Sequence, residues 1–172
     1  MEIRLVRPDE WAALKALRLR ALGSDPDAFG GRLEDAIEHD DDRWRKRASA
    51  DPAEAATFVA EEPDGALVGM AVGARIQERP DAAGLFGMWV APEARGQGIG
   101  GALVDAVAHW ARSVGFERIG LGVATANMGV VAFYERKGFA VLGEPVPMQE
   151  GSSLRMLRMV ASLDAVIGPP SS

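Results

Sequence analysis

Four glycines and one arginine in a short segment form the part of this sequence best suited to chemistry. The segment reads Arg95-Gly96-Gln97-Gly98-Ile99-Gly100-Gly101 and lies where a strand pattern gives way to a long helical pattern. Glycines let a ligand approach the backbone closely, and the first N–H groups of a helix lack acceptors inside that helix. Together with the positive end of the helix dipole, these groups predict a binding site for a pyrophosphate.

Two other interpretations of this loop are possible. A tight strand-to-helix turn would need only one or two glycines. Gly96, Gly98 and Gly101 also satisfy the G-x-G-x-x-G pattern of dinucleotide sites, which places an acidic residue at the end of the next strand. Here the next strand ends in residues 123–127 without an acidic residue, and several strands precede the loop. A dinucleotide-dependent oxidoreductase therefore stays a distant alternative.

The elements that position the loop are predicted from hydrophobic periodicity and turn residues. The expected strands lie at residues 2–7, 56–61, 66–77, 85–91, 118–125, 139–146 and 154–161. The expected helices lie at residues 11–22, about 32–48, 99–114 and 127–137. Short turns between the strands of the 56–91 segment favour antiparallel neighbours, and the helix at 99–114 connects two strands as a βαβ unit.

This order predicts an α/β protein with a single-domain, mixed, largely antiparallel central sheet flanked by helices. Residues 1–166 form the expected domain, and residues 167–172 are expected to be a disordered tail.

The segment around the loop resembles the first motif of the GNAT acetyltransferases, with Arg95, Gly98 and Gly100 at the characteristic positions. The preceding residues 88–92 resemble the fourth strand of that family. The second half of the family signature is a helix that begins with Asn and carries a Tyr shortly before Gly-Phe. Asn127 and Tyr134 fit it, and the resemblance extends over nearly the whole chain.

The resemblance implies an acyl-CoA N-acyltransferase fold that uses acetyl-CoA as co-substrate and no metal. By analogy, backbone amides of the loop hold the pyrophosphate, the backbone of a strand pairs with the pantetheine arm, Asn127 bonds to that arm, and Tyr134 faces the sulfur as the catalytic acid. The implied cofactor-binding residues are Met88, Trp89, Val90, Arg95, Gly96, Gln97, Gly98, Ile99, Gly100, Gly101, Asn127 and Tyr134.

Some of these residues have a purely structural alternative. Asn127 is a good helix N-cap, and Tyr134 suits the buried face of an amphipathic helix. The general base is unassigned, because Gly84 and Phe86 stand where many relatives carry a glutamate on the fourth strand. The candidates by proximity are Glu61, Glu62 and Glu78.

The acceptor is expected between the helical segment that follows the first helix and the last pair of strands. The loop at residues 24–31 would form one wall, with Phe29 as an apolar substrate contact, and residues 145–148 the other. The acidic run Asp40-Asp41-Asp42 either attracts a cationic substrate or starts a solvated helix. The resemblance implies an N-acetyltransferase whose acceptor is a primary amine of a small molecule, a peptide or a protein.

Composition excludes several classes of function. The chain of 172 residues has no cysteine, two histidines and a formal net charge of −6, which argues against disulfides, thiolate or histidine-rich metal sites and sequence-independent nucleic-acid binding. No signal-peptide pattern or membrane-spanning stretch is present, so we expect a cytoplasmic protein without membrane contact. A homodimer is expected from the frequency of symmetric oligomers. The main alternative to an N-acetyltransferase is a non-catalytic acyl-CoA-binding module of the same fold.

Overall fold

The computed structural model describes residues 1–29 and 31–170, and in that part of the chain eight strands form one sheet. The strand order is β1-β2-β3-β4-β5-β8-β6, and β7 pairs with β8. The strands are β1 (Glu2–Leu5), β2 (Ala55–Glu61), β3 (Leu67–Arg75), β4 (Ala82–Val90), β5 (Arg118–Ala124), β6 (Ala140–Val141), β7 (Val146–Pro147) and β8 (Arg155–Ser162). All pairs are antiparallel except β4 with β5, which confirms the predicted mixed sheet and βαβ unit.

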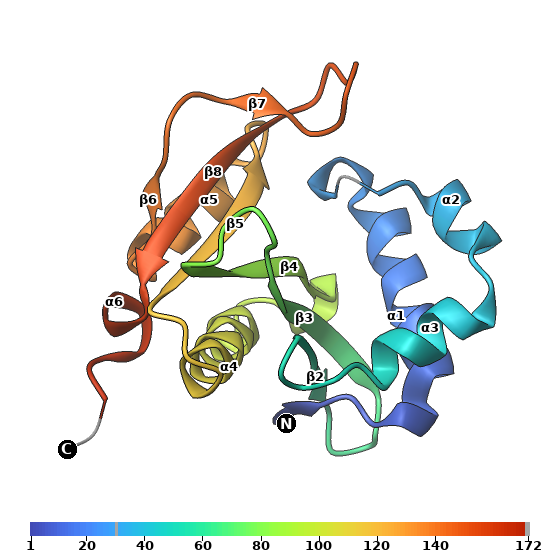
Figure 1. Cartoon of the computed structure of the whole chain (residues 1–172). Coiled ribbons are helices and arrows are strands. Elements are labelled where there is room, and N and C mark those ends of the chain that lie inside the picture. Colours follow the sequence, from blue (N-terminus) through green and yellow to red (C-terminus); the bar gives the residue numbers. More distant parts are fainter. Residues whose placement is uncertain (30, 171–172) are drawn as a thin grey trace.

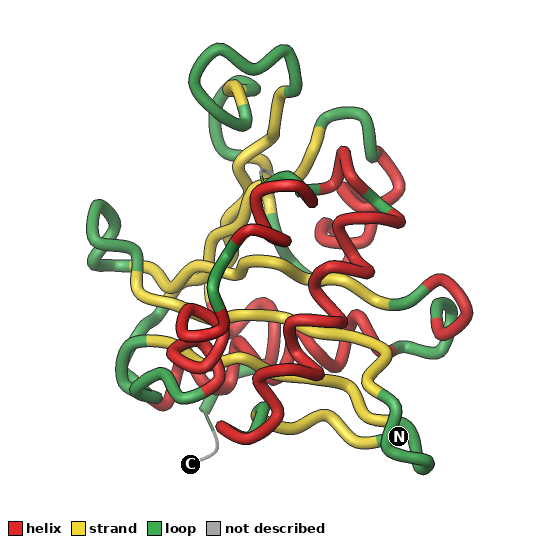
Figure 2. The backbone as a smooth tube through the Cα atoms, turned by 90° about the vertical axis from the view of Figure 1, so that its right-hand side faces the viewer, coloured by secondary structure: helices red, strands yellow, loops and turns green. Residues whose placement is uncertain are grey.

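Helices cover both faces of this sheet. They are α1 (Trp11–Ser24), α2 (Leu33–Glu38), α3 (Asp41–Ala48), α4 (Ile99–Ser113), α5 (Met128–Arg136) and α6 (Leu163–Ile167), with short 3-10 turns η1 (Pro8–Glu10), η2 (Pro26–Ala28) and η3 (Pro92–Ala94). The N-terminal helices α1–α3 lie on one side of the strands and α4 on the other (Figure 1). Figure 2 shows α1 crossing in front of the strands.

The main core lies between α4 and the sheet, because the apolar positions of α4 form one stripe. Ile99, Leu103 and Val107 of this helix are fully buried, as are Val59 of β2 and Ile119 of β5. This packing fixes the start of α4, and with it the glycine loop, against the central strands. A fixed scaffold of this kind is what a ligand-binding loop requires.

The structure differs from the sequence-based expectation in three elements. The helical region expected at residues 32–48 is two helices, because Asp40 is extended and caps α3 by accepting a hydrogen bond from the Arg43 N–H. The strand expected at 139–146 is interrupted: only Ala140–Val141 (β6) and Val146, the first residue of β7, are in strands, with Gly143 between them in a left-handed conformation. The helix α6 was not expected; the Ser162 side chain caps it at the end of β8. Ser171 and Ser172, the end of the predicted tail, lie outside the described residues.

A separation between β4 and β5 shapes the centre of the sheet. The two parallel strands pair only where Ala82–Gly84 faces Arg118–Gly120, and then they diverge (Figure 1). β5 continues beside β8 as far as Ala124, while β4 continues beside β3 as far as Val90. The facing edges of residues 85–90 and 121–124 therefore have no strand partner among the described residues.

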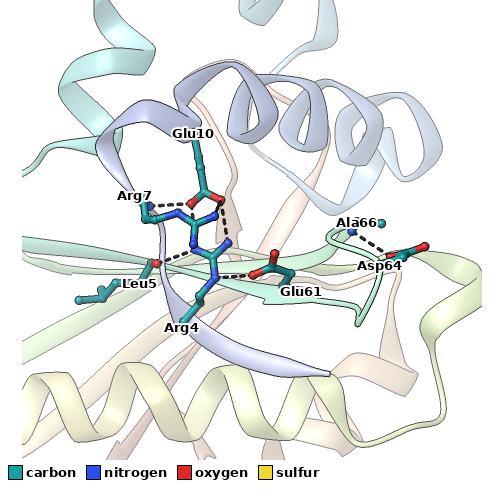
Figure 3. Close-up of polar contacts among 7 residues, drawn as sticks. All are labelled: Arg4, Leu5, Arg7, Glu10, Glu61, Asp64 and Ala66. Atoms are coloured by element: carbon teal, nitrogen blue, oxygen red, sulfur yellow. Dashed lines mark hydrogen bonds and ion pairs between the residues drawn. The ribbon is translucent and has the colours of Figure 1, made fainter.

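An ion-pair cluster joins the N-terminal strand to the 3-10 turn before α1 and to β2. The Arg4 guanidinium donates to both carboxylate oxygens of Glu10 at 2.7 and 2.8 Å and to Glu61 at 2.5 Å (Figure 3). Glu10 also accepts a hydrogen bond from the Arg7 backbone N–H. The hydrogen bonds from Arg4 lower the pKa of Glu10 from 4.5 to about 2. Burial opposes this shift but is outweighed.

This cluster predicts a specific acid sensitivity. The unfolded chain binds a proton at Glu10 near its ordinary pKa, whereas the folded chain resists protonation until about pH 2, so stability falls as the pH drops from about 4.5 towards 2. We expect Glu10→Gln to lower the free energy of unfolding at pH 7 by about 1–2 kcal/mol and to reduce that acid-dependent fall. Urea unfolding at pH 7 and pH 3 measures both effects.

The matched control is Glu38→Gln, since Glu38 is exposed on α2 and has no ion pair in the described part of the chain. It should leave the acid dependence of the wild type intact. Equal pH dependence in the wild type and Glu10→Gln would show that the cluster does not control acid stability.

Candidate active site

A cavity of about 1190 Å³ fills the opening between β4 and β5. Its walls come from the diverging strands, the glycine loop and first turn of α4, the start and middle of α5, and the segment that follows α1. Ligand sites usually measure about 300–1,000 Å³, so this cavity has room for an extended ligand and a second, smaller one.

Six successive backbone amides at the edge of this cavity lack partners among the described residues, and five of the six residues line it. The N–H groups of residues 96–101 donate to no backbone or side-chain acceptor in residues 1–29 and 31–170. Gly96 and Gly98 adopt left-handed conformations with φ of 80° and 81°, which glycine tolerates best. A Cβ built on Gly96, Gly98 or Gly101 would meet no described atom within 4 Å. The loop is thus an open cradle of donors at a helix N-terminus, which suits a pyrophosphate.

The backbone amide of Arg95 was predicted to bind the pyrophosphate together with the other loop amides, but it has a partner within the protein. This N–H donates to the Pro92 carbonyl at 3.3 Å. The Arg95 guanidinium donates through Nε to the Val90 carbonyl at 2.9 Å and through Nη2 to Asp25 at 2.8 Å. Arg95 therefore holds the glycine loop against the end of β4 and against the segment that follows α1.

Asp25 is the shared acceptor of this arrangement and was not predicted from the sequence. It also accepts a hydrogen bond from the Trp89 indole Nε1 at 2.7 Å. Burial alone would raise the pKa of Asp25, but the hydrogen bonds from Trp89, Arg95 and Ser24 outweigh it and hold that pKa below its usual value. An ionised carboxylate that already accepts several bonds is a positioning group and a poor proton acceptor.

A β-bulge shapes β4 at the cavity. Between the pairs Val72–Phe86 and Met70–Trp89, β4 contains one residue more than β3. Gly87 lies in this bulge with a φ of +57°. Bulges redirect a strand and often lie next to functional sites. Beyond this one, the free edge of Met88–Val90 is available to pair with an extended ligand.

Asn127 and Tyr134 line the opposite wall from α5. The Asn127 side-chain oxygen caps α5 by accepting a hydrogen bond from the Val130 N–H at 3.3 Å, and its amide NH₂ donates to no acceptor among the described residues. Tyr134 is 5% exposed, and burial raises the pKa of its phenol. Its hydroxyl has no hydrogen-bond partner in the described part of the chain. The structure thus shows Asn127 as the helix cap, and its position on the cavity wall is compatible with the predicted contact to a ligand.

The comparisons with known proteins identify the family. The model of the Acetyltransferase (GNAT) family matches residues 18–139, which is most of the chain. The chain belongs to the GNAT acetyltransferase family. This result removes the oxidoreductase alternative.

Two curated relatives match this GNAT chain over part of their length. A mycothiol acetyltransferase of Propionibacterium freudenreichii is 33% identical over 141 residues, which cover 81% of this chain and 43% of the relative. An aminoglycoside N(6')-acetyltransferase type 1 of Klebsiella aerogenes is 34% identical over 98 residues, covering 52% of this chain and 62% of the relative. The chain therefore spans less than two thirds of either relative.

A solved structure confirms the fold. The yncA protein of Salmonella typhimurium superimposes with a TM-score of 0.77 at 22% identity, covering 100% of this chain and 99% of that one. This agreement confirms the predicted acyl-CoA N-acyltransferase type of architecture.

The GNAT cavity brings together nearly all of the predicted site residues. Gln97 is the exception: it does not line the cavity, although its amide is free. Phe29 and Met148 line both the cavity and a groove beside it, so the two predicted acceptor walls meet here. Gly30, which the predicted loop includes, lies outside the described residues.

The acidic residues proposed from proximity are distributed differently. Glu61 pairs with Arg4 away from the cavity. Asp41 and Asp42 pair with Lys15 and Arg45, so the acidic run belongs to the helical layer. Of the candidates, only Glu78 lines the cavity, where it has no ion pair in the described chain.

Gly84 and Phe86, the positions at which the resemblance led us to look for a carboxylate, lie on β4. The Phe86 ring lies over Gly84, where a Cβ would come within 2.3 Å of the Phe86 Cε2. This end of the cavity is therefore apolar.

Among residues 1–29 and 31–170, no group of three or more histidines and carboxylates could hold a metal ion. None of the helices in these ranges has the length and hydrophobicity that crossing a bilayer requires.

Proposed function

We propose that this chain is an N-acetyltransferase that moves the acetyl group of acetyl-CoA to a primary amine. The row of free amides at residues 96–101, beside the unpaired edge of β4, carries this proposal. A pyrophosphate on the loop and an extended pantetheine arm on the strand edge would satisfy both sets of unused backbone groups.

The relatives support the same activity. The yncA structure of Salmonella typhimurium contains acetyl-CoA, and both curated relatives are named as acetyltransferases. The aminoglycoside enzyme acts, by its name, on an amino group. These names support an amine as the acceptor without defining which one.

Acetyl-CoA supplies an activated carbonyl carbon attached to a thiol leaving group. The acceptor nitrogen must be neutral to form the new C–N bond, and its surplus proton must reach a base. Glu78 is our candidate, directly or through water, since Asp25 is already occupied by its donors. As the C–N bond forms and the C–S bond breaks, Tyr134 donates its phenolic proton to the departing sulfur, and the Met88 region of β4 holds the carbonyl in position.

The burial of Tyr134 fits a proton donor. Because burial raises the pKa of its phenol, the hydroxyl remains protonated throughout the neutral and mildly alkaline range. Its missing hydrogen-bond partner within the described chain leaves the proton available to a ligand in the cavity.

A turnover assay with acetyl-CoA and a panel of primary amines tests the proposed function. Calorimetric titration with acetyl-CoA separates binding from chemistry. Micromolar binding combined with acetylation of an amine supports an enzyme. Binding without turnover across polyamines, aminoglycosides, amino acids and peptides would favour the alternative, a non-catalytic acyl-CoA-binding module.

We also propose that the protein is a cytoplasmic homodimer with a small-molecule or peptide acceptor and without nucleic-acid or membrane partners. Its acidic balance supports the lack of nucleic-acid binding. Three exposed apolar residues at β6 and before β8 offer contact area for a second copy: Val141, Leu142 and Leu154. Sedimentation that shows a monomer at micromolar concentration would contradict the dimer.

A further inference from the structure

Arg18 is a charged residue on the inward face of α1. Its neighbours on that face, Leu14, Leu17 and Ala21, are buried. Its guanidinium lines the cavity and lies 4.3 Å from the centre of the Phe29 ring. Nη1 also borders the bulge of β4, since a Cβ built on Gly87 would lie 3.5 Å from it. Arg18 therefore lies beside Phe29 and the bulge of β4, next to the strand segment that we propose to hold the thioester.

This guanidinium has no counter-ion in the described part of the chain. Nη1 is buried and lacks a hydrogen-bond partner, and no carboxylate lies within ion-pair distance. Of the two cavity carboxylates, Asp25 is engaged by Trp89 and Arg95, and Glu78 forms no ion pair with Arg18. Burial lowers the pKa of Arg18 to about 10, and the charge of Arg47 adds to this effect.

A half-buried cation such as Arg18, with one nitrogen fully buried and no partner, loses part of its hydration without gaining a counter-charge, which destabilises the folded protein. At neutral pH Arg18 is still charged, since its pKa stays well above 7. The stacking contact with Phe29 fixes the plane of the guanidinium but does not neutralise it. A ligand that brings an anionic group would remove this cost, so the site is incomplete without one.

Apart from Glu78, our candidate base, the rest of the acceptor end is apolar or basic. Phe29, Phe86 and Ile76 contribute apolar surface, and the Arg158 side chain lines the same cavity without a partner among the described residues. The acidic run at Asp40–Asp42 contributes nothing here because it lies in the helical layer. These surroundings disfavour a polycation and favour a ligand with one anionic group and an apolar remainder.

We propose that Arg18 binds the carboxylate of the acceptor, and that the acceptor is a small primary amine of the amino-acid class with an apolar side chain. The carboxylate would pair with the part of the guanidinium that lines the cavity, in the planar geometry that arginine offers to carboxylates. The apolar side chain would lie against Phe29 and Phe86, which leaves the amine directed at the thioester. This inference rests on the proposed function and assigns its substrate class.

Paired acceptors test the proposal. Acetylation of L-leucine and L-methionine is compared with acetylation of leucinamide, isoamylamine and spermidine by the wild type, Arg18→Met and Lys15→Gln. We expect the wild type to prefer the carboxylate acceptors about 10- to 100-fold in kcat/KM, in line with a charge-assisted hydrogen bond. Arg18→Met should lose this preference while keeping its activity on isoamylamine. Lys15→Gln removes a cation from the same helix, away from the cavity, and should keep it.

Two further measurements keep the outcomes distinct. Arg18→Met should bind acetyl-CoA with the affinity of the wild type and should melt at an equal or higher temperature. A structural role for Arg18 would instead lower the melting temperature of this variant. Direct titration of L-leucine and L-methionine onto the CoA-saturated protein tests the site without turnover. Absence of acetyl-CoA binding would defeat the proposed function. Three results would overturn the role of Arg18 without affecting the proposed function. They are a wild-type preference for isoamylamine or spermidine, an equal loss of activity with all acceptors in Arg18→Met, and the absence of saturable amino-acid binding.

Discussion

Replacing Gly100 by valine should weaken acetyl-CoA binding by about 10²–10³-fold while leaving the protein folded. A Cβ built on Gly100 would lie 3.6 Å from the Phe133 Cζ and 3.9 Å from the Met88 Cε, inside the cavity and at ordinary contact distance. The added methyl groups would then occupy the space next to the free amides of the loop. Loss of two charge-assisted hydrogen bonds, each worth about 1.5–3 kcal/mol, accounts for an effect of this size.

Gly100 gives a cleaner test than Gly98. Gly98 has a φ of +81°, so valine there strains the backbone regardless of any ligand, and a loss of binding would have two causes. Gly100 has no such conformation and belongs to the first turn of α4. Gly98→Val should also bind poorly, but with a lower melting temperature.

The matched control is Gly129→Ala in α5, where a Cβ would meet only the Asn127 side chain, at 3.9 Å. It should bind acetyl-CoA normally and melt at an equal or higher temperature, since alanine favours a helix more than glycine does. Calorimetry measures the affinities and thermal melting measures the fold. Unchanged affinity in a folded Gly100→Val variant would mean that the loop is only a turn.

The glycine loop could be predicted from the sequence because its signal is local. Closely spaced glycines at the start of an apolar helical pattern place free N–H groups at a helix N-terminus whatever the rest of the fold does. The same holds for Asn127, whose capping role follows from its place before a helix. Asn127 and Tyr134 face one cavity because they lie two helical turns apart, which is also a local property.

The separation of β4 from β5 could not be predicted in the same way. Residues 85–90 and 121–124 both look like ordinary strands, and where their pairing ends depends on how each sheet half packs on its helices. The Asp25 contacts are similarly hidden, because Trp89 and Arg95 lie 64 and 70 residues away along the chain. No periodic pattern encodes a hydrogen bond of that range.

Arg18 did have a sequence signal. It lies four residues after Leu14 and three before Ala21, which is an inward position of the apolar stripe on α1. A charged residue on such a stripe is either paired inside the protein or available to a ligand. Only the structure separates these possibilities, since the acid that would pair with Arg18 is missing from the described residues around it.

Replacing Tyr134 by phenylalanine should lower kcat by about 10²-fold and change acetyl-CoA affinity by less than about threefold. General acid catalysis typically contributes about 10²–10⁴-fold, and the lower end applies because a thiolate leaves readily and water can partly replace the phenol. The ring itself would stay in place. It packs edge-on against Phe133 and Phe139 at centroid distances of 5.0 and 5.5 Å, contacts that phenylalanine retains.

The competing interpretation of Tyr134 as a core residue makes a different prediction. If only its packing matters, Tyr134→Phe should leave both kcat and affinity near wild type, because the lost hydroxyl has no partner within the described chain. Steady-state kinetics, calorimetric titration with acetyl-CoA and thermal melting separate the two. A kcat within about twofold of wild type would remove Tyr134 from the proposed mechanism. If kcat falls strongly while the melting temperature and the acetyl-CoA affinity stay unchanged, the lost activity is due to the missing phenolic proton, which the buried Tyr134 retains as the pH rises.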